Sequence, residues 1–266
     1  PKIITNGIQV SQGLYDNNNV TFVVWNWKAN GGTTSSNSDG SITSTVQANT
    51  DAGFSIVTYT GTGASSATIG HGLGAVPKML IVRNRSEAYN WKVYHAENTS
   101  APETDYLVLD NTDATADNVT HWNDTAPTSS VFSIGSSNAL IKNTNTFVAY
   151  CFAEIEGYSK FGSYTGNGSA DGTFVYLGFR PAWLMVKRYD STNNWHLWDT
   201  TRGTINPMGS GSILVADNVY TESQLGSVLD ILSNGFKPRA NSSGYNNGSY
   251  IYMAFAEAPF KYANAR

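Results

Sequence analysis

Tyr59-Thr-Gly-Thr-Gly63 returns later in the chain, with one change, as Tyr164-Thr-Gly-Asn-Gly168. Each copy is followed by a proline that opens an apolar run, Pro77-Lys-Met-Leu-Ile-Val82 in the first and Pro181-Ala-Trp-Leu-Met-Val186 in the second. Both copies then carry a tryptophan at the same distance from that proline and close on the tripeptide Phe-Ala-Glu. Matching anchors in the same order predict two copies of one structural unit.

The N-terminal residues match the end of the second copy. Ile3-Ile-Thr-Asn-Gly-Ile8 aligns with Ile231-Leu-Ser-Asn-Gly-Phe236, and at the same offset Thr21–Trp27 aligns with Ser249–Phe255. We therefore interpret residues 1–28 as the terminal hairpin of a preceding unit. Because a lone hairpin is marginally stable in water, we expect it to pair with a partner chain or with another unit.

The repeat divides the chain into four predicted segments. These are the terminal hairpin 1–28, a linker 29–52 rich in Gly, Ser, Thr and Asn, a first β-unit 53–157 and a second β-unit 158–266. The linker composition is typical of flexible chain. Its second half alternates at period two from Ser41 to Gln47, so a strand there is an open alternative.

Short apolar runs bounded by turn residues are typical of strands. Asn6-Gly7 and Asn234-Gly235 are hairpin-turn signals, because both residue types tolerate positive φ. No long window keeps a helical period. The sequence predicts an all-β fold of two tandem antiparallel β-sandwich-like units, related by the internal repeat.

The composition excludes several classes of protein. Charged residues make up 14% of the chain and the net charge is −4, which argues against a nucleic-acid partner. No apolar stretch is long enough to span a bilayer as a helix, so membrane insertion is not expected. The single cysteine, Cys151, stands in an apolar run and is predicted to be a buried, inert thiol.

Metal and catalytic motifs are weak. One loop contains four acidic or amide residues, Asp110, Asn111, Asp113 and Asp117. They do not match the spacing of the calcium-binding loop of an EF-hand. A calcium site and an Asx turn without a metal both stay open as interpretations of this loop. Neither a Gly-x-Ser-x-Gly elbow nor a His-Glu-x-x-His motif occurs. We expect no enzyme and no cofactor.

The aromatic residues fall into two groups: those that recur at matching positions in both copies, and those that differ between the copies. Trp91, Trp195, Phe152 and Phe255 recur at matched positions and are predicted to be packing scaffold. Aromatic residues that differ between the copies are the better ligand-binding candidates, provided that they are exposed. The alternative is that they lie on the surface or at an interface and bind no ligand. They are Tyr89, Tyr94, His121, Trp122, Tyr158, Tyr189, Trp198 and Tyr245.

Three stretches carry a resemblance to a known family: Ala52–Gly63, Ile69–Gly74 and Pro77–Ser86, followed by Asn90-Trp-Lys-Val-Tyr-His95. Together they resemble a repeat module of virion structural proteins of marine and cyanobacterial tailed phages, which are labelled tail fibre or adhesin-like. The resemblance implies a virion location, homotrimeric assembly and recognition of the host surface. It supplies no catalytic motif.

We therefore expect a segment of a phage tail fibre, located on the virion tail or surface and extracellular. Its expected partners are a host cell-surface glycan, other virion proteins and further copies of itself in a trimer. The first alternative is a purely structural virion protein, such as a capsid decoration or fibre shaft. The second is a polysaccharide depolymerase, against which the absence of a non-repeated carboxylate pair counts.

Overall fold

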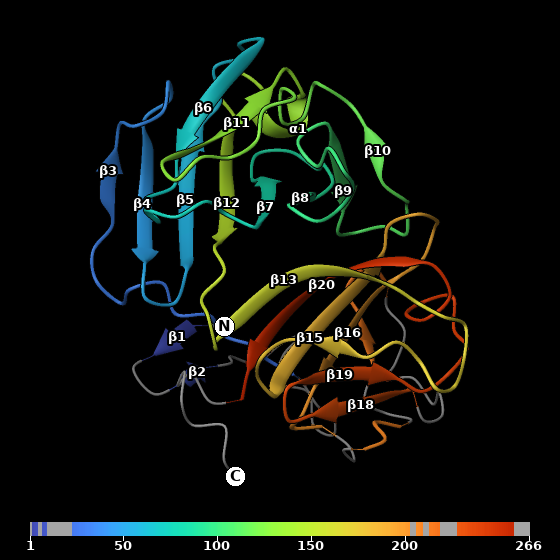
Figure 1. The fold of residues 1–266 in the computed structure, drawn as a ribbon. Helices are drawn as coiled ribbons and strands as arrows, with labels where there is room; N and C mark the ends of the chain where they lie inside the picture. The colour runs from blue at the N-terminus through green and yellow to red at the C-terminus, as the bar shows by residue number, and fades with distance from the viewer. Residues whose placement is uncertain are drawn as a thin grey trace.

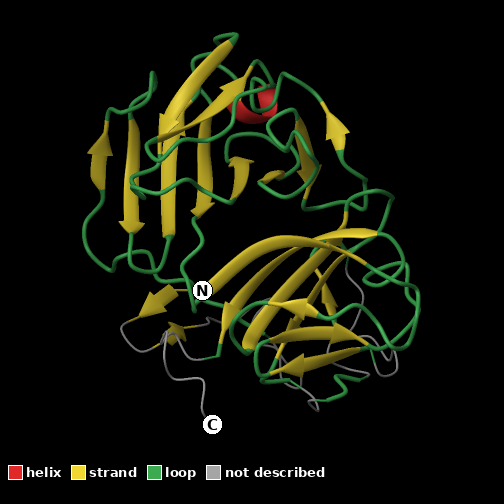
Figure 2. Cartoon of the chain, in the orientation of Figure 1, coloured by secondary structure: helices red, strands yellow, loops and turns green. Residues whose placement is uncertain are grey.

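The structure is a computed structural model that describes residues 2–4, 7–9, 23–202, 206–209, 213–218 and 228–257, the first two ranges by their backbone alone. Nearly every described element is a strand, and the strand ladders are antiparallel. Within these ranges the one helix is the single turn α1 (Asn138–Ile141). Figure 2 shows this all-β architecture, which confirms the predicted fold class. None of the described helices is long and apolar enough to cross a bilayer.

The first large sheet has eight strands. In spatial order they are β10 (Ala116–Asp117), β9 (Asp105–Val108), β8 (Lys92–His95), β7 (Met79–Asn84), β12 (Thr146–Phe152), β5 (Phe54–Thr60), β4 (Ser44–Asn49) and β3 (Ser35–Asn37). A pair of strands, β6 (Ser66–Gly70) and β11 (Val131–Gly135), covers one face of this sheet.

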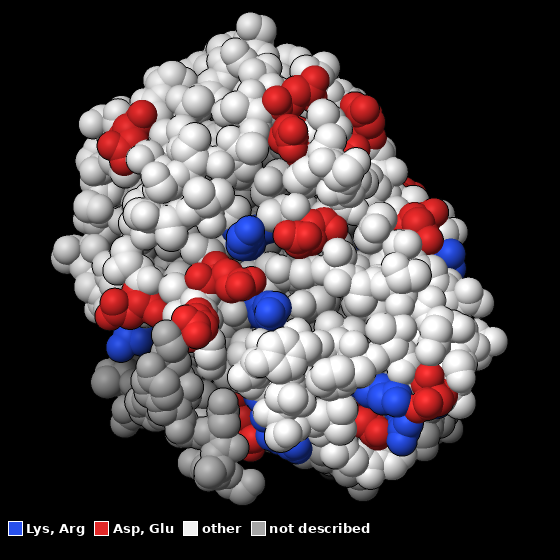
Figure 3. All heavy atoms as spheres, in the orientation of Figure 1, with Lys and Arg blue, Asp and Glu red and all other residues white. Residues whose placement is uncertain are grey.

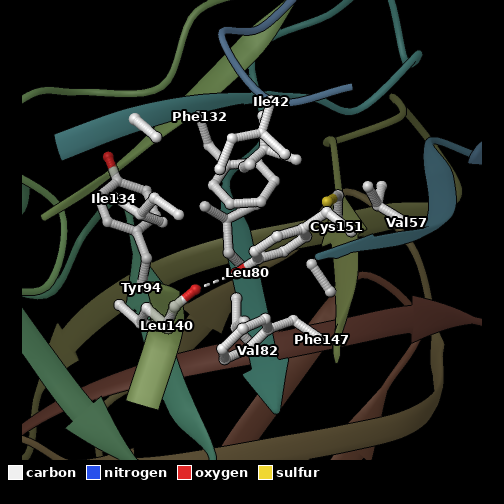
Figure 4. Packing of buried hydrophobic residues seen from close by; sticks show 14 of the residues in the cluster. Ile42, Val57, Leu80, Val82, Tyr94, Phe132, Ile134, Leu140, Phe147 and Cys151 are labelled. Carbon is white, nitrogen blue, oxygen red and sulfur yellow. Dashed lines mark hydrogen bonds between the residues drawn. The ribbon is translucent and has the colours of Figure 1, made fainter. Parts of the chain in front are cut away.

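The core of the first unit lies between the large sheet and the β6–β11 pair. Leu80, Phe132 and Phe147 are fully buried there, as Figure 4 shows. Cys151 belongs to the same cluster, which confirms the predicted buried thiol. Burial raises the pKa of this thiol to about 12, so it stays protonated and unreactive.

The second large sheet has five described strands. Their order is β13 (Ser159–Thr165), β20 (Ser249–Ala256), β15 (Pro181–Arg188), β16 (Trp195–Asp199) and β17 (Leu214–Val215). A small sheet of β14 (Val175–Tyr176), β19 (Gly235–Pro238) and β18 (Leu229–Leu232) covers one face.

The two large sheets share one central strand order, since β5-β12-β7-β8-β9 corresponds to β13-β20-β15-β16-β17. A buried contact recurs as well. The hydroxyl of Tyr59 donates to the Leu140 carbonyl at 2.8 Å, and that of Tyr164 donates to the Tyr245 carbonyl at 2.6 Å. Such matches are expected if both sheets derive from one repeated unit.

The free faces of the two large sheets pack against each other. Figure 1 shows the first sheet in the upper half and the second below it, with their strands running in crossing directions. A cluster of buried residues joins them, including Phe54 and Phe152 from the first sheet and Trp183, Trp195 and Phe255 from the second. The described molecule therefore has four layers, with the two large sheets in the middle.

The N-terminal segments differ in part from the prediction. The hairpin of β1 (Lys2–Ile4) and β2 (Gly7–Gln9) has the same register as the β18–β19 hairpin. Among the described strands, β1 and β2 pair only with each other. The expected linker 29–52 supplies β3 and β4, so the linker prediction is wrong there, and the alternative of a strand is confirmed for β4.

Candidate functional site: an aromatic cleft between the sheets

The two large sheets leave an apolar cavity between them, which we call the interface cleft. Its volume is about 470 Å³. One wall comes from each sheet, and residues 25–27 complete the lining. Among the described residues, none that lines the cleft is Asp, Glu, Lys, Arg or His. A mainly apolar cavity of this size is typical of sites for small molecules.

The first wall is a row of aromatic rings on the eight-stranded sheet, from β5 across β12 to the start of β8. The rings of Phe54 on β5 and Tyr150 on β12 have centroids 6.5 Å apart and planes 6° apart. Trp91, just before β8, lies 6.2 Å from Tyr150 at 19°. These nearly parallel rings form one ring row and give the cleft an aromatic surface.

The second wall is formed by β15, β16 and β20. Met185 pairs with Leu197 on one side and with Met253 on the other, so three flexible or branched apolar side chains lie in line. Trp183 adds an indole ring that is 8% exposed, and its Nε1 has no hydrogen-bond partner among the described residues. Methionine side chains adapt readily to ligands of irregular shape.

Residues 23–29 form an extended strap at the cleft. From Val23 to Lys28 the side chains alternate between half-buried and exposed, and Ala29 is buried, but the strap joins neither sheet by a ladder. The indole of Trp25 donates to Asp199 Oδ2 at 3.2 Å, and the ring of Trp27 lies 5.2 Å from that of Trp183. Both tryptophans also line a smaller cavity of about 270 Å³ beside the cleft.

An ion pair lies beside Trp91. The guanidinium carbon of Arg83 is 5.4 Å from the centroid of the Trp91 ring, and Arg83 Nη1 is 3.5 Å from Asp110 Oδ2. Asp110 Oδ1 also accepts from the Trp91 backbone N–H at 3.0 Å. The pair therefore fixes Trp91 and places polar atoms next to an aromatic face.

Three hydrogen bonds from side chains to backbone carbonyls hold the two sheets in place around the cleft. Trp195 Nε1 donates to Val108 O at 2.8 Å, and Lys187 Nζ donates to Thr112 O at 3.0 Å. His95 Nε2 lies 3.1 Å from Tyr252 O. Burial lowers the pKa of Lys187 to about 8 and that of His95 to about 4.

Five of the eight ligand-binding candidates are buried, so the expectation that they are exposed is wrong. They are Tyr94, His121, Trp122, Trp198 and Tyr245. Tyr94 packs edge to face on Trp122 with centroids 6.0 Å apart, and Trp198 packs on Tyr245 at 5.7 Å. Each unit fills its own core with its own rings, so a difference between the copies does not indicate a surface position.

The other three candidates are half-buried and lie in different parts of the fold. Tyr89 is in the turn after β7, where its carbonyl accepts from Arg83. Tyr158 precedes β13 and lines the smaller cavity, and Tyr189 follows β15 at the edge of the sheet–sheet cluster. Of the eight, none lines the interface cleft.

The predicted scaffold residues Trp195, Phe152 and Phe255 are buried, as expected. Trp91 is half-buried and lines the cleft, so the scaffold prediction is wrong for this residue. Sequence reasoning also missed Trp25 and Trp27, which it assigned to a hairpin of another unit. The signal for them was the alternation Trp-Asn-Trp, which places both rings on one side of an extended segment.

The loop from Asp110 to Asp117 does not gather its acidic groups. Asn111 Oδ1 accepts from the Asp113 backbone at 3.0 Å, which is an Asx turn, and Asp110 is engaged with Trp91 and Arg83. Within the described ranges, no group of three or more His, Cys, Asp or Glu could hold a metal ion. Figure 3 shows charged residues scattered over a largely uncharged face of the molecule.

Comparison with known proteins gives one match. No curated protein and no solved structure matches the chain. A family model does, and it extends over residues 2–259, including both large sheets, the strap and the N-terminal hairpin. The chain therefore belongs to the family described as a domain of unknown function, DUF7483.

Proposed function

We propose that this chain is a non-catalytic binding segment of a phage tail fibre, which recognises a glycan on the host surface. The resemblance of its repeat to modules of virion proteins motivates the location on the virion, outside the host cell. In the same proposal, the chain assembles as a homotrimer and contacts other virion proteins.

The observation that carries the proposal is the ring row of the cleft, ending at Trp91 beside the Arg83–Asp110 ion pair. Aromatic faces stack on the apolar faces of sugar rings, while charged and polar groups bind the hydroxyls. Tyr150 and Trp91 supply the first kind of contact, and Arg83 and Asp110 supply the second.

The test is binding of the whole chain to a glycan array and to purified host lipopolysaccharide. Trp91→Ala is expected to weaken binding at least tenfold, because it removes the stacking surface next to the ion pair. Tyr176→Ala is the matched control, since Tyr176 is 60% exposed and lies outside the cleft. Retention on no surface polysaccharide, or equal binding by both variants, would contradict glycan recognition.

The runner-up is a structural virion protein with no ligand of its own. The burial of five of the eight candidate rings favours it, because those rings serve packing rather than recognition. Copy number on the particle separates the two functions. A few trimers at the tail support an adhesin, whereas hundreds of copies support a decoration protein.

A further inference from the structure

The wall chemistry of the interface cleft restricts what can enter it. Side-chain polar atoms in the described lining are limited to the Asn26 amide, the Tyr150 hydroxyl and indole N–H groups. The indole of Trp25 is already bonded to Asp199. A group rich in hydroxyls would leave most of them without partners in the cleft, and burying a hydroxyl without a partner is unfavourable.

Two ion pairs lie beside lining residues of the cleft, and in each of them the charges are matched. Arg83 pairs with Asp110 at one end, and Arg202 pairs with Asp199 at 2.6 Å beside Trp25. Because no described lining residue is charged, an ionised ligand inside the cleft would lose its hydration without a counter-charge in the lining. The lining fits an uncharged, apolar group instead.

We propose that the interface cleft binds an alkyl or acyl chain, so that the ligand is an acylated sugar whose chain enters the cleft and whose polar part stays at the Trp91 end. Met185 and Met253 can adjust to a flexible chain, and Phe54, at the end of the ring row away from Trp91, covers its other side, which leaves Tyr150 and Trp91 to the sugar. The inference rests on the proposed function for its sugar part and deepens it by naming the part of the ligand that is buried.

The test uses N-phenyl-1-naphthylamine, an uncharged fluorophore that becomes bright in apolar sites, with the whole chain. We expect its emission to rise on binding. Octanol and octyl glucoside, the latter as monomer, should displace the probe, and methyl glucoside should not. No rise in emission, or displacement by methyl glucoside alone, overturns the inference.

Ala216→Trp is the variant that fills the cleft. Ala216 is an exposed residue of the lining, so a larger side chain there occupies the cleft without removing core contacts. We expect it to weaken probe binding at least tenfold, whereas Ala88→Trp, at an exposed alanine outside the lining, should leave binding unchanged. Equal probe binding by the two variants overturns the inference.

Leu109→Gln is a second variant, which places a polar group in the lining should Ala216→Trp fail to fold. It too should weaken probe binding, and wild-type binding would contradict the inference. Because the probe contains no sugar, its result is separate from that of the glycan array. Glycan binding without probe binding removes the acyl-chain assignment alone, and probe binding without glycan binding removes the proposed function.

Discussion

His95 makes the contact between the two large sheets sensitive to pH. The Glu97 backbone N–H donates to its Nδ1 at 3.2 Å, so the neutral ring carries its proton on Nε2 and donates it to Tyr252 O. A second proton would have to replace the bond from Glu97 in a buried position. Burial accordingly lowers the pKa of His95 to about 4, and the buried rings of His121 and His196 have pKa values lowered to about 4 as well.

The chain should therefore lose stability as the pH falls from about 6.5 towards 4. The unfolded chain takes up these protons near pH 6.5, whereas the folded protein does so only near 4, and each histidine contributes up to roughly 3 kcal/mol. His95→Gln keeps a donor for Tyr252 and removes the titration. Urea unfolding at about pH 7 and about pH 4.5 should show a smaller pH-dependent loss in this variant. An equal loss in both proteins would refute the role of His95.

Trp91 and Trp195 show what sequence can predict about single residues. The two backbone N–H groups donate to equivalent carboxylates, Asp110 at 3.0 Å and Asp217 at 2.9 Å, as an alignment of the copies implies. Their surroundings differ, because the Trp195 indole reaches Val108 of the other sheet and Trp91 faces the cleft. The two tryptophans lose their equivalence because the two copies pack against each other. A comparison of the two copies in the sequence cannot reveal that packing.

Trp27 holds the strap in place against the second large sheet. Its ring contacts those of Trp183 at 5.2 Å and Phe255 at 5.5 Å, while the strap has no ladder to stabilise it. Trp27→Ala should lower the free energy of unfolding by about 2 kcal/mol, less than for a fully buried tryptophan. Val24→Ala, at a residue 54% exposed, should change it by about 0.5 kcal/mol or less. Urea unfolding measures both, and equal effects would show that the strap is not held by Trp27.

The strands differ in how strongly the sequence marks them. β7 and β15 are predicted well, because each is a long apolar run opened at a proline. β4 carries a weaker signal, since Ser44 and Val46 face the core but its other residues are small or polar. Composition therefore suggested a linker for a segment whose backbone completes the sheet. The interface cleft could not be predicted, since its lining comes from ten separate stretches of the chain.

The stability of the whole molecule depends on the contact between the two large sheets. Apart from its own core, each half presents an apolar face, with Phe54 and Phe152 on one side and Trp183, Met185 and Phe255 on the other. The strand pattern predicts two sandwiches, but it does not say that their outer faces cover each other. That contact converts two units into one four-layer body and creates the cleft.

The two halves should consequently be unstable apart. Fragments 29–157 and 158–257 would each expose the apolar face that the other covers, so we expect each to self-associate or to unfold without a sharp transition. Mixing them should restore a one-to-one complex with cooperative urea unfolding, measured by size-exclusion chromatography and tryptophan fluorescence. The control is the intact chain with a protease site between Gly157 and Tyr158, which should stay associated after cleavage because the sheet–sheet contacts remain. If each fragment elutes as a monomer and unfolds cooperatively, the sheets are independent units, and the cleft between them is not a fixed site.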